Sequence, residues 1–170
     1  MQITRSSIET MKGPADWFTG DVYIDAVATP EATSTFAAAL VHFTPGARTA
    51  WHTHPHGQTI FVTEGVGLCR REGGPIEEIR PGDRVFFEPG ENHWHGAAPN
   101  RFMAHVAIQE ADDSGSPVTW GEHVTDEQVG APERIHAPII RGARASRRLP
   151  GGQPSSAGAA PYSSLSLIHI

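Results

Sequence analysis

The chain has 170 residues, enough for one ordinary domain, and hydrophobic residues make up 38% of it, which allows a packed core without disulfide staples. A formal net charge of −6 argues against a nucleic-acid-binding protein, and no apolar stretch approaches the ~18 residues of a membrane span. The chain begins without an apolar leader, and Cys69 is its only cysteine, so the cytoplasm is the expected compartment.

Short runs of apolar and β-branched residues, separated by turn signals such as Pro81-Gly82 and Pro89-Gly90, occupy the first 130 residues. Runs of this length and spacing are typical of an all-β sandwich or barrel. In chain order, we expect strands at residues 22–27, 36–43, 59–63, 67–71, 76–79, 84–87 and 102–109. A short helical turn is expected only at residues 125–129.

The chain changes character near residue 130, after which Arg, Ala, Pro, Gly and Ser dominate without a sustained period. Such a segment buries too little apolar surface to offset the entropy of ordering, so residues 131–170 are expected to be a disordered, low-complexity tail. The last six residues, 165–170, match the in-frame translation of a transposon end used to prepare sequencing libraries. We therefore expect residues 165–170 to be foreign sequence and leave them out of the fold.

Two His-x-His pairs are the chemically distinctive feature of the sequence. Residues two apart in a strand share a face, so His52 and His54 project together, and His93 and His95 repeat this spacing. Gln58 opens the strand that follows the turn at residues 55–57. A site of three neutral imidazoles and one amide oxygen suits a divalent ion of iron, manganese, cobalt, nickel or zinc. Because such ligands are all neutral, the ion would keep its full positive charge as a Lewis acid.

The two pairs lie in segments that resemble the two motifs of the cupin superfamily. The first motif consists of a glycine, a His-x-His pair, an acidic residue and a second glycine. In this chain it corresponds to Gly46, His52, His54, Gln58 and Gly65. Gln58 therefore stands where the usual motif has a glutamate ligand, which changes the charge of the site.

The second motif corresponds to Gly82, Glu88, Pro89, Gly90 and His93. Glu88 replaces the usual proline, and Ala97 stands at the position of the asparagine that often closes this motif. Both departures are expected to be structural. The paired motifs at the expected separation imply a cupin fold, a small antiparallel β-barrel or jelly-roll sandwich, over residues 1–130.

Several segments narrow the resemblance, among them FTPGARTAWHTHPHGQT, PGENHWHGAAP and HVAIQE. Together they look like the small bacterial cupins that include manganese-dependent hydroxynitrile lyases. This resemblance implies one divalent ion, with manganese expected first. It also implies a small-molecule substrate and a homo-oligomer, a dimer or a tetramer. The metal ligands that it implies are His52, His54, Gln58 and His93.

Strand alternation identifies further candidates for the pocket. In the strand at 102–109, His105 and Gln109 lie on a mixed face that suits a polar lumen, whereas the opposite face is wholly apolar and should pack against a second sheet or a subunit. His95 shares the face of His93 and is a candidate general base; the alternative is that it only hydrogen-bonds a backbone carbonyl. The substrate wall is expected to consist of Ala39, Val41, Phe43 and Thr49.

The expected activity is cleavage or formation of an α-hydroxynitrile, with His95, His105 and Gln109 as the catalytic residues. A second hypothesis is an iron- or manganese-dependent dioxygenase that acts on a small organic molecule. A third is a cupin that binds a small molecule without catalysis, because sharing a site does not settle the reaction.

Overall fold

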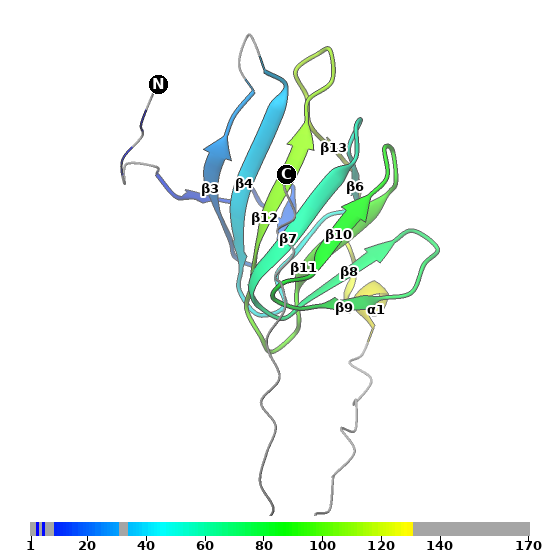
Figure 1. Cartoon of the computed structure of the whole chain (residues 1–170). Helices are drawn as coiled ribbons and strands as arrows, with labels where there is room; N and C mark the ends of the chain where they lie inside the picture. Colours follow the sequence, from blue (N-terminus) through cyan, green and yellow to red (C-terminus); the bar gives the residue numbers. More distant parts are fainter. Residues whose placement is uncertain (1–2, 4, 6–8, 31–33, 131–170) are drawn as a thin grey trace, which may run out of the picture. The chain divides into compact units, whose positions relative to one another are not determined.

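Short antiparallel strands dominate the computed structural model, which describes residues 3, 5, 9–30 and 34–130 (Figure 1). The all-β fold class expected from the sequence is confirmed. The tail expected at residues 131–170, with the suspected foreign sequence at 165–170, lies outside the described residues. Within the described ranges, no helix has the length and hydrophobicity needed to cross a bilayer.

The first sheet has six strands in the order β1-β3-β4-β12-β7-β10 (Figure 1). Every pairing in it is antiparallel, and the strand order places β12 between β4 and β7, which are far from it in the sequence. Its strands are β1 (Met11–Lys12), β3 (Val22–Ala28), β4 (Phe36–Phe43), β7 (Gln58–Gly65), β10 (Arg84–Phe87) and β12 (Met103–Glu110).

The second sheet has seven strands, five of them in the order β13-β6-β11-β5-β2, while β8 pairs with both β11 and β9. These strands are β2 (Phe18–Thr19), β5 (Arg48–Thr49), β6 (His52–Thr53), β8 (Gly67–Arg71), β9 (Glu77–Ile79), β11 (His93–Ala97) and β13 (Thr119–Trp120). Gly96 of β11 lies so close to β5 that an added Cβ would stand 2.4 Å from the Ala47 carbonyl oxygen. This close approach lets β5 pair with β11 at Gly96, and β6 pairs with β11 farther along, at His93.

Each of the seven strands expected from the sequence overlaps an observed strand, with ends that differ by up to two residues. The expected helical turn is α1 (Asp126–Val129). Thr125 caps it, because the Thr125 hydroxyl accepts from the Gln128 backbone N–H and the Gln128 side chain accepts from the Thr125 N–H. This reciprocal pair is a capping box.

The hydrophobic core lies between the two sheets and follows the strand alternation. Ile60 and Val62 of β7 are fully buried, whereas Phe61 between them is 44% exposed. On β12, Met103 is fully buried and Ala107 is 5% exposed, and both belong to the same core cluster. The inner faces of β7 and β12 therefore form one wall of the lumen, as the period of two predicts.

The chain after β12 returns to the second sheet and is held there by a buried arginine. The Arg48 guanidinium donates twice to the Val124 carbonyl, at 3.0 and 2.8 Å, and forms a 2.7 Å ion pair with Asp126. β13 pairs with β6, which places Trp120 opposite His52. The returning segment thus covers the end of the lumen where the histidines lie.

Candidate metal centre and substrate cavity

The two His-x-His pairs expected from the sequence meet in the second sheet. β6 and β11 are antiparallel neighbours, and His52 is the register partner of His93. Their ring centroids are 4.2 Å apart, and those of His52 and His54 are 5.1 Å apart. His52, His54, His93 and His95 are each 3% exposed or less. Strand pairing therefore gathers the histidines of both motifs in one buried cluster.

Three of these imidazoles are anchored in the same way, through Nδ1 to a backbone carbonyl. His52 Nδ1 lies 2.9 Å from the Ala50 oxygen, and His93 Nδ1 lies 2.8 Å from the Glu91 oxygen. His54 Nδ1 lies 2.6 Å from the carbonyl oxygen of Pro117. A carbonyl oxygen only accepts hydrogen bonds, so Nδ1 carries the proton in each ring. In each neutral ring Nε2 then keeps a free lone pair, which is the arrangement of metal-ligating histidines.

Gln58 completes a set of electron-pair donors. Its Oε1 lies 3.3 Å from His93 Nε2, and its Nε2 donates to Gln109 Oε1 at 3.2 Å, which fixes the orientation of the amide. Desolvation lowers the pKa of His93 to about 3, so its ring is neutral at physiological pH. Two lone pairs therefore face each other across 3.3 Å with no proton between them. A cation bound by both atoms resolves this repulsion.

The other buried imidazoles support the same interpretation. His54 Nε2 is buried and has no hydrogen-bond partner among the described residues. Desolvation lowers the pKa of His54, and it lowers the pKa of His52 well below the ordinary value, with a further contribution from His93. Gly57, with φ of 80°, makes the turn that carries the chain from His54 to Gln58. The donor set of three imidazoles and one amide oxygen thus fits a divalent metal ion.

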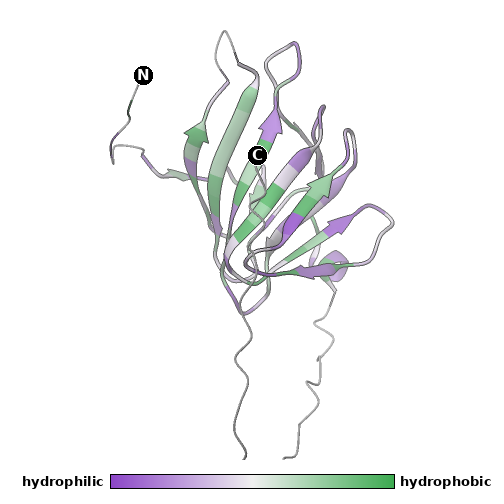
Figure 2. Cartoon of the chain, viewed as in Figure 1, coloured by the Kyte–Doolittle hydropathy of each residue, from purple (hydrophilic) through white to green (hydrophobic). Residues whose placement is uncertain are grey.

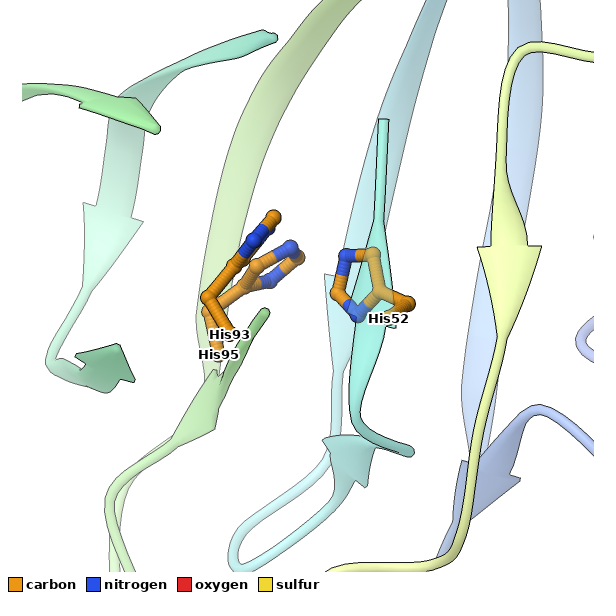
Figure 3. A group of neighbouring side chains, drawn as sticks. All are labelled: His52, His93 and His95. Atoms are coloured by element: carbon orange, nitrogen blue, oxygen red, sulfur yellow. The ribbon is translucent and has the colours of Figure 1, made fainter. Parts of the chain in front are cut away.

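In the described part of the chain, His52, His93 and His95 form a group that could hold a metal ion, with one nitrogen of each within 4.8 Å of the others. Figure 3 shows His93 and His95 side by side, with His52 facing them from the adjacent strand. This triad differs from the implied ligand set because it contains His95 in place of His54. The assignment of His54 and Gln58 as ligands therefore stays a prediction.

His95 and His105 form a separate pair next to the cluster. His95 Nδ1 and His105 Nε2 are 3.3 Å apart, and the His95 backbone N–H donates to Thr49 Oγ1 at 3.1 Å. His95 Nε2 and His105 Nδ1 are buried and have no partner among the described residues. Desolvation lowers the pKa of His105 to about 3 and that of His95 well below its ordinary value. Both rings are therefore neutral, and one proton lies between them.

A cavity of about 180 Å³ opens beside these histidines. Of the side chains expected around a substrate, Val41, Phe43, Thr49, His95, His105 and Gln109 line it. His52, His54 and Gln58 line it as well. Ala39, which was expected to belong to the substrate wall, does not line the cavity and is instead half-buried and packed against the core. The mixed face of β12 therefore faces the lumen, as its alternation indicates.

An aromatic wall on this cavity was missed in the sequence. Trp17 and Trp120 stack with ring centroids 5.3 Å apart and planes 9° apart, and Trp120 lies 4.8 Å from the ring of His52. Phe18 packs edge-on against Trp120 at 5.7 Å. These residues lie at opposite ends of the described chain, outside the expected strands. Only the pairing of β2 with β5 and of β13 with β6 brings them to the site.

Comparison with known proteins identifies the family. A family model described as a cupin domain matches residues 39–106. An (R)-mandelonitrile lyase from Granulicella tundricola is 60% identical over 129 residues, which cover 75% of this chain and 98% of that protein. The chain belongs to the cupin family. The similarity supports a cupin lyase, and the buried histidines could bind a metal.

Solved structures agree on the fold. A cupin-like protein from Thermotoga maritima has a TM-score of 0.66 and 38% identity, over 72% of this chain and 93% of that one. A polyketide cyclase from Streptomyces resistomycificus has a TM-score of 0.59 and covers 75% of this chain and 89% of its own. At 18% identity the second likeness shows the fold alone.

Proposed function

We propose that this cupin is a divalent-metal-dependent lyase that cleaves or forms α-hydroxynitriles. The proposal rests on the lone pair of His93 Nε2, which faces the Gln58 oxygen. Beside this pair lies the cavity, and its lining includes His54, whose Nε2 has no partner among the described residues. The 60% identity to an (R)-mandelonitrile lyase supports the choice of reaction. The same site would serve both directions, because the addition of cyanide to a carbonyl is the reverse of the cleavage.

In this proposal His52, His54, Gln58 and His93 hold the ion. Manganese is the expected metal, and iron, cobalt, nickel and zinc suit the same donors. A bound divalent ion would supply positive charge that stabilises the negative charge developing on the substrate oxygen. The four ligands are neutral, so they leave that charge undiminished. The chain itself then has to place the substrate and handle one proton.

His95 is the group that takes the proton. Its Nε2 has no partner among the described residues, and the side chain lines the cavity. For Nε2 to accept, Nδ1 carries a proton and donates to His105 Nε2, so His105 sets the tautomer of His95. As the hydroxyl proton passes to His95, the C–O bond becomes a carbonyl and the C–CN bond breaks. Cyanide leaves with the electron pair and then takes the proton back as HCN.

The remaining lining residues hold the substrate. The Gln109 carbonyl oxygen accepts from Gln58, which leaves the Gln109 amide N–H groups free to donate to the nitrile. Val41 and Phe43 supply an apolar wall, and the stacked Trp17 and Trp120 supply an aromatic one. Aromatic walls favour an aryl substituent, which packs against them edge-on or in offset stacks.

The direct test combines metal analysis of the purified protein with release of benzaldehyde from mandelonitrile, before and after removal and return of manganese. We expect activity to be lost on chelation and recovered with the ion. His54→Ala should lower both metal content and activity, and His95→Ala should lower activity at full metal content. His123→Ala changes an exposed histidine and is the matched control.

A manganese-loaded sample that releases no aldehyde or ketone from any cyanohydrin would overturn the proposal. Consumption of O₂ with a candidate substrate would instead favour the dioxygenase hypothesis. Binding of a small molecule that survives His95→Ala and His105→Ala, in a parent protein without turnover, would favour a binding protein.

A further inference from the structure

Phe87, the last residue of β10, packs directly against a candidate metal ligand. Its side chain is 4% exposed, whereas that of the preceding Phe86 is 50% exposed. Figure 2 shows β10 passing from a hydrophilic first residue to a hydrophobic end. The rings of Phe87 and His93 stack, with centroids 3.6 Å apart and planes 9° apart. An aromatic ring therefore covers one face of the His93 imidazole.

The backbone of Phe87 reaches a second candidate ligand. Phe87 is the register partner of Gln58 in the pairing of β10 with β7. An added Cβ at Gly57 would stand 2.7 Å from the Phe87 carbonyl oxygen, so the turn before Gln58 also packs closely against β10. Phe87 thus contacts His93 through its ring and is paired with Gln58 through its backbone. These are the two side chains whose lone pairs face each other at 3.3 Å.

The turn between β10 and β11 is fixed to the same site. The Glu91 N–H donates to the Glu88 carbonyl at 3.0 Å, and Gly90, with φ of 73°, takes the third position, as in a type II turn. The Gly90 N–H donates to the His54 carbonyl at 2.9 Å. The Glu91 carbonyl accepts from His93 Nδ1 at 2.8 Å. The backbone of this turn is therefore tied to two candidate ligands, which limits how far the end of β10 can move from them.

Such support is needed because the metal-free arrangement is repulsive. His93 Nε2 and Gln58 Oε1 carry lone pairs with no proton between them. The last side-chain torsions of His and Gln have broad preferences, so torsion alone would let the imidazole and the amide turn away from each other. The hydrogen bond to Glu91 fixes one edge of the imidazole, and the ring of Phe87 on its face blocks rotation out of its plane. Packing thus supplies the restraint that the torsions lack.

We propose that Phe87 is a positioning residue, which keeps His93 and Gln58 in the geometry that binds the metal ion. The inference rests on the metal centre of the proposed function. Because the stack opposes the repulsion between the two lone pairs, the ligands are organised before the ion binds, and less free energy is spent on ordering them at that step. An imidazole bound to a cation also carries more positive charge, which the negative face of the Phe87 ring attracts. Both effects favour the metal-bound protein.

Phe87 lies outside the lining of the substrate cavity. Gln58 lines the cavity, whereas neither His93 nor Phe87 is among the described residues that do so. His93 is fully buried. A substitution at Phe87 therefore leaves the walls of the cavity in place, and its effect should appear in the affinity for the metal ion.

Manganese binding by the full chain, measured in competition with a chelating dye, tests the proposal without reference to activity. We expect Phe87→Leu to raise the dissociation constant at least about tenfold, as is usual for changes to groups that orient metal ligands. The electron paramagnetic resonance spectrum of the bound manganese should also change, because the ligand geometry changes. Phe86→Leu makes the same substitution at the exposed neighbour, and should leave the spectrum unchanged and the dissociation constant within about twofold of the parent.

A second control separates positioning from general destabilisation. Val22→Ala truncates a fully buried side chain on β3, which is separated from β10 by β4, β12 and β7. It should lower the free energy of unfolding in urea and change the dissociation constant by less than about twofold. Phe87→Met replaces the ring with a flexible side chain that fills irregular gaps, and it carries the same expectation if Phe87→Leu does not fold.

Three results would overturn the inference. Binding by Phe87→Leu within about threefold of the parent would show that the stack does not position the ligands, and the metal centre of the proposed function would remain. An equal loss of affinity in Val22→Ala would assign the effect to overall stability. A parent chain that binds no divalent ion would remove the metal centre itself, and the proposed function with it.

Discussion

Acid should destabilise the metal-free protein, because its buried histidines are held neutral. His105 is fully buried, and desolvation lowers its pKa to about 3. In the unfolded chain the pKa of the same imidazole is about 6.5. Above that pH the ring is neutral in both states and has no effect on stability. Below it the unfolded chain takes up a proton that the folded protein does not, so stability falls until the pH approaches about 3.

The expected loss follows from this difference in proton binding. Each pH unit below the unfolded pKa costs about 1.4 kcal/mol, so at about pH 5 the single residue His105 lowers the free energy of unfolding by about 2 kcal/mol. Desolvation lowers the pKa of His93 to about 3 as well, and it therefore adds to the loss in the same direction. A bound metal would oppose this effect, because its ligands are held deprotonated.

The assay is urea unfolding of chelator-treated protein at about pH 7.5 and pH 5, followed by tryptophan fluorescence. In His105→Asn the difference between the two pH values should be smaller than in the parent by about 2 kcal/mol. Only this difference is compared, because the substitution also changes stability at either pH. His123→Asn, at an exposed position, is the control. If His105→Asn lost as much stability as the parent between the two pH values, the reasoning would be refuted.

Three other changes test the site and its packing. Gln58→Glu should tighten manganese binding at least about tenfold, measured in competition with a chelating dye, because the carboxylate adds negative charge to the ligands. The same charge should slow cleavage, because it makes the ion a weaker Lewis acid. Weaker manganese binding would count against Gln58 as a ligand. Cys69 is 5% exposed, and desolvation raises its pKa to about 11. A thiol reagent should therefore label Cys69 only after unfolding. Rapid labelling of the folded protein would contradict its burial. Arg48→Met should lower the free energy of unfolding by about 2–3 kcal/mol in urea, because the buried Val124 carbonyl loses both donors. The exposed Arg101→Met should change it by less than about 0.5 kcal/mol.

Alternation in the long strands could be predicted from the sequence because it needs only the strand period. It placed His105 and Gln109 on the lumen face of β12, and the structure agrees. The two-residue strands β2, β6 and β13 could not be predicted in this way. A run of two residues has no period, and its pairing depends on partners far along the chain.

The backbone contacts that support the candidate metal centre could not be predicted from the sequence either. His54 is anchored by the carbonyl of Pro117, 63 residues later in the chain. A backbone carbonyl is common to every residue type, so residue identity gives no signal for it. The stack of Trp17 on Trp120 has the same origin, because only the tertiary fold brings the two rings together. Sequence reasoning therefore found donors that have a recognisable side chain and spacing, and it missed groups whose role is set by position alone.

Residue parity alone also misplaces one side chain of β7. Gln58, Ile60 and Val62 face inward, and Glu64 has the same parity, yet Glu64 is exposed. The register explains this difference: Ala104 pairs with Glu64 and His105 with Val62, so Thr63 is an extra residue, a β-bulge. The Thr63 hydroxyl donates to the Ala104 carbonyl at 3.1 Å, which compensates for the interrupted ladder. Without this bulge a carboxylate would enter the core, at the cost of desolvating its charge. Pairing with β12, rather than parity along β7, therefore decides which residues of β7 face the candidate metal centre and which face outward.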